Sequence, residues 1–141
     1  MKLQLVSLTG LTYDDDAYEV IIPTAEGEIA VYPGHMPLVS LAVPGLLTIR
    51  KERGDSDKSR DQYAIAGGVV EIDGENVRIL VDEVEKPDDI VEAEAKVAFE
   101  RAQKLKSEAT SQVEIEKAQA LVDRHAVRLH IAELRRHRPR G

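Results

Sequence analysis

Cysteine and tryptophan are absent from this 141-residue sequence, and its aromatic side chains are limited to one phenylalanine and four tyrosines. The lack of cysteine excludes disulfide scaffolds and thiolate metal sites. So few aromatic rings argue against a stacking platform for nucleic-acid bases. No stretch approaches the roughly 20 apolar residues that span a bilayer, and residues 1–6 predict a strand rather than a signal or transit peptide. We therefore expect a soluble, unprocessed chain without a metal site.

Charge is divided unevenly along the chain. The formal net charge is −7, yet residues 124–141 contain six arginines and one glutamate, a local net charge of +5, so the remainder carries −12. A nucleic-acid-binding protein is expected to present a basic domain, which this acidic chain does not. An acidic body with a basic end suggests that the end meets an acidic protein partner or folds back on its own body. A solvated helix end, whose arginines complement the helix dipole, explains the same charges.

The first half of the chain shows the alternation of polar and apolar residues that β-strands have. Its clearest unit is the pair of apolar runs 69–72 and 77–81, joined through Asp73 and Gly74, because glycine supplies the positive φ of a tight hairpin turn. Short strands separated by glycine and proline predict a sandwich or flattened barrel. Other strands are expected at residues 2–7, 18–22, 28–32, 46–50 and 63–66, and solvated loops at residues 14–16 and 51–61.

The pattern changes from strand to helix near Pro87. Small and aliphatic side chains recur at helical spacing over residues 90–105 and 118–134, with a polar break at residues 107–111. Capping-box spacings mark both helix starts, Asp89 with Glu92 and Ser111 with Glu114. Two helices joined by a short break form an antiparallel hairpin, and its alanine-rich stripes bury little area, so we expect a weakly held element that can move. The sequence thus predicts an α+β chain, with a β-sandwich over residues 1–86 and a helical hairpin over residues 87–141.

One motif resembles a known family. Residues 26–38 are Glu-Gly-Glu-Ile-Ala-Val-Tyr-Pro-Gly-His-Met-Pro-Leu. This run closely resembles the Glu-Gly-Glu and Pro-Gly-His segment of the ε subunits of F-type ATP synthases, with Ala30 where the family often has glycine. The resemblance extends to the Gly67-Gly68 pair and to the two-helix C-terminus, and so covers nearly the whole chain. The loop over residues 51–61 is a few residues longer than is usual in the family.

The resemblance implies a ten-stranded β-sandwich followed by an antiparallel two-helix hairpin, in a non-catalytic rotor-stalk subunit of a proton-driven ATP synthase. The sandwich would bind the γ subunit and the membrane c-ring, peripheral to the cytoplasmic face of a bacterial plasma membrane. The hairpin would either fold against the sandwich or extend along γ into the catalytic α/β head and obstruct ATP hydrolysis. From the residues alone, a stand-alone β-sandwich adaptor with a helical tail is the alternative, and no arrangement of side chains suggests a catalytic site.

Two short segments are candidates for subunit contact. Glu26 and Glu28 flank a tight turn, where solvated carboxylates are poor acid–base catalysts. The resemblance places this turn toward the c-ring, although simple solubility also accounts for it. His35 has neither the partners of a catalytic triad nor those of a metal site, and its loop is expected to face γ. The loop candidates are His35, Met36, Pro37 and Leu38.

The basic end of the second helix is the candidate regulatory element, which in the family passes an acidic loop of the catalytic β subunit. Its arginines are Arg124, Arg128, Arg135, Arg136 and Arg138.

Some family members bind ATP through an Ile-Asp-x-x-Arg-Ala motif at the start of the first helix, which is Ile-Val-Glu-Ala-Glu-Ala at residues 90–95 of this chain. Val91 replaces the Asp, and Glu94 replaces the Arg and so reverses a charge beside a polyanionic ligand. The retained positions of this vestigial nucleotide site are Glu85, Ile90, Ala95, Arg124 and Arg128. We expect no cofactor, and ATP binding that is weak or absent.

Overall fold

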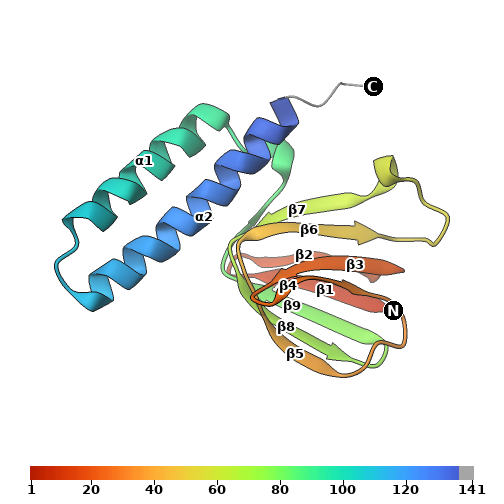
Figure 1. The fold of residues 1–141 in the computed structure, drawn as a ribbon. Coiled ribbons are helices and arrows are strands. Elements are labelled where there is room, and N and C mark those ends of the chain that lie inside the picture. The colour runs from red at the N-terminus through yellow and green to blue at the C-terminus, as the bar shows by residue number, and fades with distance from the viewer. Residues whose placement is uncertain (137–141) are drawn as a thin grey trace. The chain divides into compact units, whose positions relative to one another are not determined.

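The computed structural model describes residues 1–136, apart from the side chains of Asp57 and Arg136. In that part of the chain it contains ten strands, two short 3-10 helices and two α-helices (Figure 1). They form two compact units, Met1–Glu85 and a second unit that begins at Lys86. The strands are β1 Lys2–Ser7, β2 Gly10–Asp16, β3 Glu19–Thr24, β4 Gly27–Val31, β5 Leu38–Ala42, β6 Gly45–Arg50, β7 Asp61–Ile65, β8 Gly68–Asp73, β9 Asn76–Val81 and β10 Val84–Glu85.

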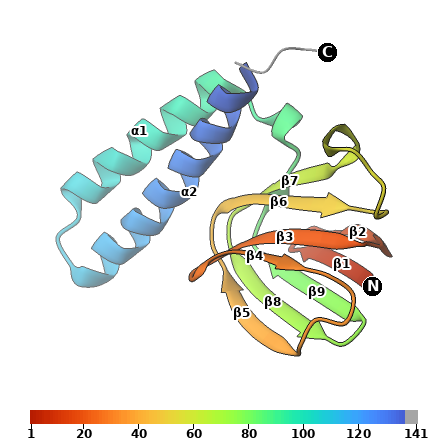
Figure 2. The ribbon, with the colours of Figure 1, turned by 45° about the vertical axis from the view of Figure 1, so that its right-hand side comes forward.

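The strands of the first unit form two layers. One layer has the order β4-β3-β6-β7-β10, and the other has the order β5-β8-β9-β1-β2. The layers join where Thr24 of β3 pairs with Ala42 of β5, and Figure 2 shows them curving around one interior. Neighbouring strands are antiparallel except for β1 and β9, which are parallel. The predicted ten-stranded sandwich is therefore confirmed.

The core lies between the two layers and is built by alternation. In β9, Val77, Ile79 and Val81 are buried, while Arg78 and Leu80 point outward. Each fully buried aliphatic side chain contributes about 1.5–3 kcal/mol relative to an exposed one, which fixes the register of every strand that has a buried face. The fully buried large side chains are Leu3, Leu5, Val20, Ile22, Val31, Leu47, Ile49, Val70, Val77 and Ile79.

The Gly67-Gly68 pair has a geometric cause. Gly67 has a φ of +112°, a conformation that side chains rarely tolerate. A Cβ atom on Gly68 would lie 1.9 Å from the carbonyl oxygen of Leu80 on the neighbouring strand. Any other residue at position 68 would push β8 away from β9, so the resemblance at these two glycines reflects a packing requirement.

Two segments differ from the sequence-based expectation. Residues 14–16 were expected to be a loop, but they lie in β2, where Asp14, Asp15 and Asp16 pair with β1. β2 is at the edge of its layer, where carboxylates stay solvated while Tyr13 packs inward, and such charges suit an edge strand because they discourage pairing with other chains. The proline-bounded run after His35 is likewise a strand, β5.

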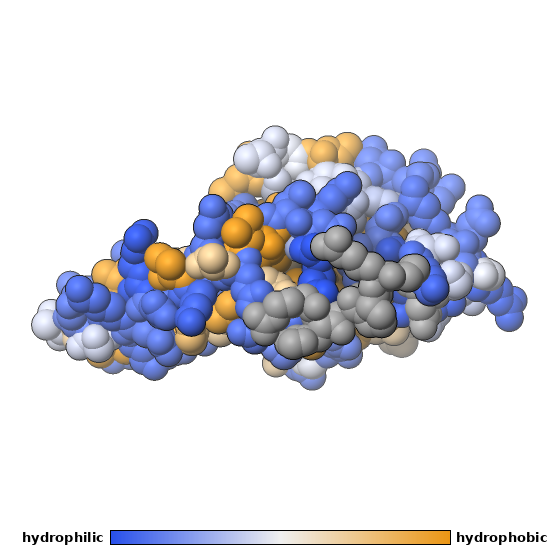
Figure 3. All heavy atoms as spheres, turned by 90° about the horizontal axis from the view of Figure 1, so that it is seen from above, coloured by the Kyte–Doolittle hydropathy of each residue, from blue (hydrophilic) through white to orange (hydrophobic). Residues whose placement is uncertain are grey.

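The second unit contains a 3-10 turn, η2 Pro87–Asp89, and two antiparallel helices, α1 Glu92–Glu108 and α2 Gln112–Arg136. The predicted two-helix hairpin is therefore confirmed. The surface visible in Figure 3 is mostly hydrophilic with scattered apolar side chains, and the residues that α1 buries are Ala95 and Ala102. No helix among residues 1–136 is long and apolar enough to span a membrane.

The two helix starts differ from each other. The predicted capping box of Asp89 with Glu92 is wrong, because Asp89 ends the 3-10 turn and α1 begins after Val91 without a side-chain cap. At α2 the prediction is confirmed in part, since the amide of Glu114 donates to Ser111 Oγ at 3.2 Å. The Glu114 carboxylate accepts from Thr110, through its amide at 2.9 Å and its hydroxyl at 3.2 Å. These hydrogen bonds hold the pKa of Glu114 below its ordinary value.

Candidate subunit-contact sites

An apolar row crosses the outer face of the β5-β8-β9-β1-β2 layer. It consists of Leu41, Val69, Leu80, Val6 and Leu11, each paired with the next across five neighbouring strands. Leu41 is 62% exposed, Leu11 56% and Leu80 38%, whereas Val69 and Val6 are half-buried. Directly paired side chains on one face lie close enough to form a continuous surface. A continuous exposed apolar strip of this kind is typical of a protein-contact site.

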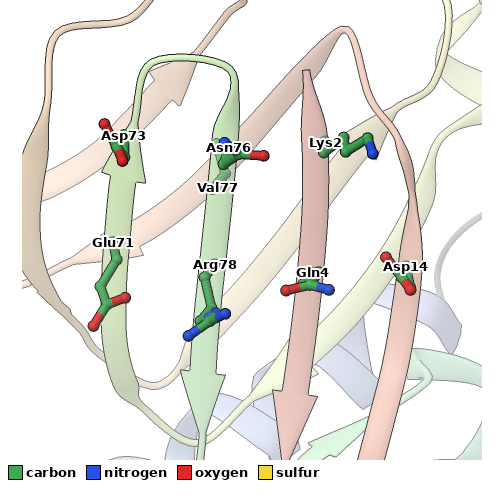
Figure 4. A pocket seen from close by; sticks show the side chains of 8 residues that line it. All are labelled: Lys2, Gln4, Asp14, Glu71, Asp73, Asn76, Val77 and Arg78. Atoms are coloured by element: carbon green, nitrogen blue, oxygen red, sulfur yellow. The ribbon is translucent and has the colours of Figure 1, made fainter.

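The neighbouring rows on the same face are polar. One row pairs Glu71, Arg78, Gln4 and Asp14, and the next contains Asp73, Asn76 and Lys2. With Val77 they line an open groove of about 540 Å³, and Figure 4 shows side chains of both charge signs along it. An apolar strip bordered by hydrated polar groups has the anatomy of a protein–protein interface.

The loop from Tyr32 to Leu38 leads into β5, at the end of the strand that lies beside the polar rows. Gly34 turns the chain with a φ of +84°, and the amide of His35 donates to the carbonyl of Tyr32 at 3.1 Å. The His35 ring lies 2.7 Å, through Nδ1, from the carbonyl oxygen of Met36. Met36 is 78% exposed and Leu38 begins β5, the strand that carries Leu41. Leu38 pairs with Ile72 and Leu41 with Val69, so the predicted candidates His35, Met36, Pro37 and Leu38 lie at the end of β5 beside the polar rows, away from the apolar row.

The base of this loop is anchored by a polar cluster that the sequence did not reveal. The hydroxyl of Tyr32 donates to the carboxylate of the buried Glu19, and Arg50 Nε lies 3.4 Å from the other oxygen of that carboxylate. This hydrogen bond raises the pKa of Tyr32. Tyr18 packs its ring against that of Tyr32 with centroids 5.7 Å apart. The cluster therefore fixes the point where the loop leaves β4.

The acidic turn is a separate site. Glu26 is exposed in the turn between β3 and β4, and Glu28 is exposed at the start of β4. The hydroxyl of Thr24 donates to the carbonyl of Gly27 at 2.5 Å. The turn and Tyr32 lie at opposite ends of the five-residue strand β4, so the two acidic residues lie away from the His35 loop.

The predicted hairpin residues have differing environments. Arg135 contacts the 3-10 turn, with Nε 2.9 Å from Asp88 Oδ1 and Nη1 donating to the carbonyl of Pro87 at 2.5 Å. Arg124 and Arg128 lie half-buried on α2. The structure describes the backbone of Arg136 but not its side chain, and Arg138 lies outside the described residues.

The residues of the vestigial nucleotide site are divided between the two units. Glu85 ends β10 in the first unit, whereas Ile90 and Ala95 are buried in the second. The two replaced positions, Val91 and Glu94, are exposed. Among the side chains that the structure describes, no three of His, Asp or Glu are arranged to hold a metal ion.

Comparison with known proteins agrees with these features. Residues 1–87 match the family model of the ATP synthase delta/epsilon chain β-sandwich domain. The ATP synthase epsilon chain of Sulfurihydrogenibium sp. is 34% identical over 132 residues, covering 93% of this chain and 96% of the relative. That of Chloroflexus aggregans is 33% identical over 134 residues, covering 95% and 93%.

Two solved structures share the fold. A chain in the mitochondrial ATP synthase of Euglena gracilis superposes with a TM-score of 0.75 at 24% identity, covering 96% of this chain and 80% of that one. A chain in the central stalk and c-ring of the Tetrahymena thermophila enzyme gives a TM-score of 0.63 at 15% identity, covering 95% of each. The family model and the curated relatives, which carry the sequence evidence, show that the chain belongs to the ATP synthase epsilon chain family.

Proposed function

We propose that this chain binds the γ subunit through the apolar row and through the His35 loop at the other end of β5, and that the turn of Glu26 and Glu28 meets the c-ring. Membership of the family makes the chain a non-catalytic central-stalk subunit of an ATP synthase rather than a stand-alone adaptor. The observation that carries the assignment of the γ surface is the apolar row, because no other set of paired strands in the described chain places five apolar side chains in succession on its outer face, three of them exposed and two half-buried.

Chemistry separates the two contact sites. The apolar row suits a partner that buries aliphatic side chains, which we assign to γ. The acidic turn has no apolar side chain larger than that of Ala25, and its carboxylates suit basic groups on the polar loops of the c-ring. The chain would then lie peripheral to the cytoplasmic face of a bacterial plasma membrane.

We assign the helical hairpin a regulatory role. It forms a compact unit of its own and buries mainly alanines between exposed polar side chains, so the free energy that keeps it closed is small. When extended, its basic end would meet an acidic surface of the catalytic α/β head and obstruct ATP hydrolysis. The exposed Glu94 opposes nucleotide binding at the start of α1, so the hairpin would respond to its protein partners rather than to ATP bound by this chain.

Co-purification tests this assignment. The full chain, expressed together with the α, β and γ subunits of its own organism, should elute with γ and restore proton-driven ATP synthesis to membranes depleted of this subunit. A folded chain that elutes apart from γ would refute the proposal.

A further inference from the structure

Arg135 joins two parts of the second unit that are far apart in the sequence. Its guanidinium lies against the 3-10 turn, with one contact to the Asp88 carboxylate at 2.9 Å and one to the Pro87 carbonyl at 2.5 Å. The side chain of Arg135 is 35% exposed, whereas that of Asp88 is 84% exposed. The contact therefore lies at the surface, where water and salt can compete for it.

The last turns of α2 support this contact. Ile131 and Ala132 are buried, and they precede Arg135 by four and three residues, so all three lie on one face of the helix. Ile90, directly after the 3-10 turn, is also buried. The end of α2 and the 3-10 turn, which Arg135 connects, thus each have a buried aliphatic residue close in sequence to the polar contact.

We propose that Arg135 acts as a clasp, which keeps the end of α2 on the 3-10 turn and so holds the hairpin closed. A planar guanidinium suits this task, because it directs two N–H groups at two acceptors in a fixed geometry. A lysine would supply the charge but not the paired donors. The regulatory consequence of the clasp rests on the function proposed above, whereas the clasp itself does not.

The clasp gives Arg135 the opposite effect to that of a basic helix end that acts on a partner. A basic helix end that acts only on an acidic partner would lose inhibition when Arg135 is neutralised. If Arg135 instead holds the hairpin closed, neutralising it favours the extended hairpin and deepens inhibition. Asp88 separates the two roles, because it is acidic and does not belong to the basic end.

The first experiment measures hydrogen exchange in the isolated full-length chain. The variants are Arg135→Gln and Asp88→Asn, with Asp89→Asn as the matched control, because Asp89 is the exposed neighbour of Asp88 and its side chain has no contact of its own in the described structure. The rate of amide exchange in residues 129–135 should rise about threefold to tenfold in both test variants. A rise of this size is expected because a charged contact at the surface stabilises the helix end only modestly. The double variant should show no further rise, and the control none.

Unchanged exchange in Arg135→Gln and Asp88→Asn, with helical circular dichroism intact, would overturn the clasp. A rise in Arg135→Gln that Asp88→Asn does not share would overturn it too, since the helix end would then be stabilised without the linker. Arg135→Lys should lie between the wild type and Arg135→Gln.

The second experiment measures ATP hydrolysis by the assembled complex. Both test variants should lower hydrolysis, while Asp89→Asn leaves it unchanged. If exchange rises but hydrolysis stays the same, the clasp stands and the hairpin is not a brake, which refutes the proposed function alone. If Arg135→Gln raises hydrolysis and Asp88→Asn does not, Arg135 acts on the partner and the clasp is refuted.

Discussion

Replacement of Leu41 by threonine tests the apolar row most directly. Leu41 lies at the β5 end of the row and is 62% exposed, so the free chain gains little from its side chain. Leucine is branched at Cγ, whereas threonine has the β-branched shape that strands favour and lacks the aliphatic end of the leucine side chain. The unfolding free energy of the isolated chain should change by about 0.5 kcal/mol or less, as is usual for surface positions.

Binding to γ should change much more. Complete burial of a leucine side chain is worth about 1.5–3 kcal/mol, and the exposed part of Leu41 would contribute roughly 1–2 kcal/mol of that when γ covers it. The dissociation constant should therefore rise by roughly 5- to 30-fold. Titration of purified γ against immobilised chain, with chemical denaturation in parallel, measures both quantities.

Val113→Thr is the control for this prediction. Val113 is 60% exposed at the start of α2, and the proposed γ surface does not include it. An unchanged dissociation constant for Leu41→Thr would remove the apolar row from the γ surface. The same conclusion would follow if Val113→Thr weakened binding as strongly, because the loss would then reflect general surface polarity.

Four further outcomes are expected. A chain ending at residue 85 should still bind γ, since the first unit contains both the apolar row and its own core; loss of binding by a folded truncation would show that the hairpin takes part in docking. Gly68→Ala should lower the unfolding free energy by about 1–3 kcal/mol in denaturant titrations, because its Cβ would overlap a backbone carbonyl, whereas Gly54→Ala, which meets open space, should be nearly neutral. The pKa of Glu114 is lowered in the folded chain, so the stability that its carboxylate gives to the start of α2 is present above the ordinary pKa of 4.5 and is lost as the pH falls through the lower folded value. Hydrogen exchange at the start of α2 should therefore rise in acid, and Glu114→Gln should abolish this pH dependence. Calorimetric titration with ATP should detect no binding at micromolar concentrations, and micromolar or tighter affinity would contradict the role given to Glu94.

The sequence predicted those elements whose pattern follows from burial on one face. β8 and β9 are examples, since alternating aliphatic residues around Asp73 and Gly74 leave one register that buries them all. β2 escaped prediction because Asp14, Asp15 and Asp16 have low strand propensity and are tolerated only at a sheet edge.

The apolar row and the clasp required the structure for another reason. Leu41 and Leu11 meet one surface only because the order of five strands places them there, and pairwise register across a sheet is not contained in local periodicity. Arg135 and Asp88 are separated by nearly the whole hairpin. The sequence identified Arg135 as functional from its charge, but the direction of its effect depends on the partner it has in the closed hairpin.

The parallel pairing of β1 with β9 has a consequence for synthesis on the ribosome. β1 is the first strand to emerge, yet one of its two neighbours comes from the far end of the sandwich, with Lys2 paired to Asn76 and Val6 to Leu80. Until β9 emerges, β1 and β2 are a lone hairpin, which is marginal in water. Such long-range pairing slows folding, and domains generally complete as units during synthesis. We therefore expect the sandwich to close at one step, once residue 81 is clear of the ribosome and while the helices are still being made.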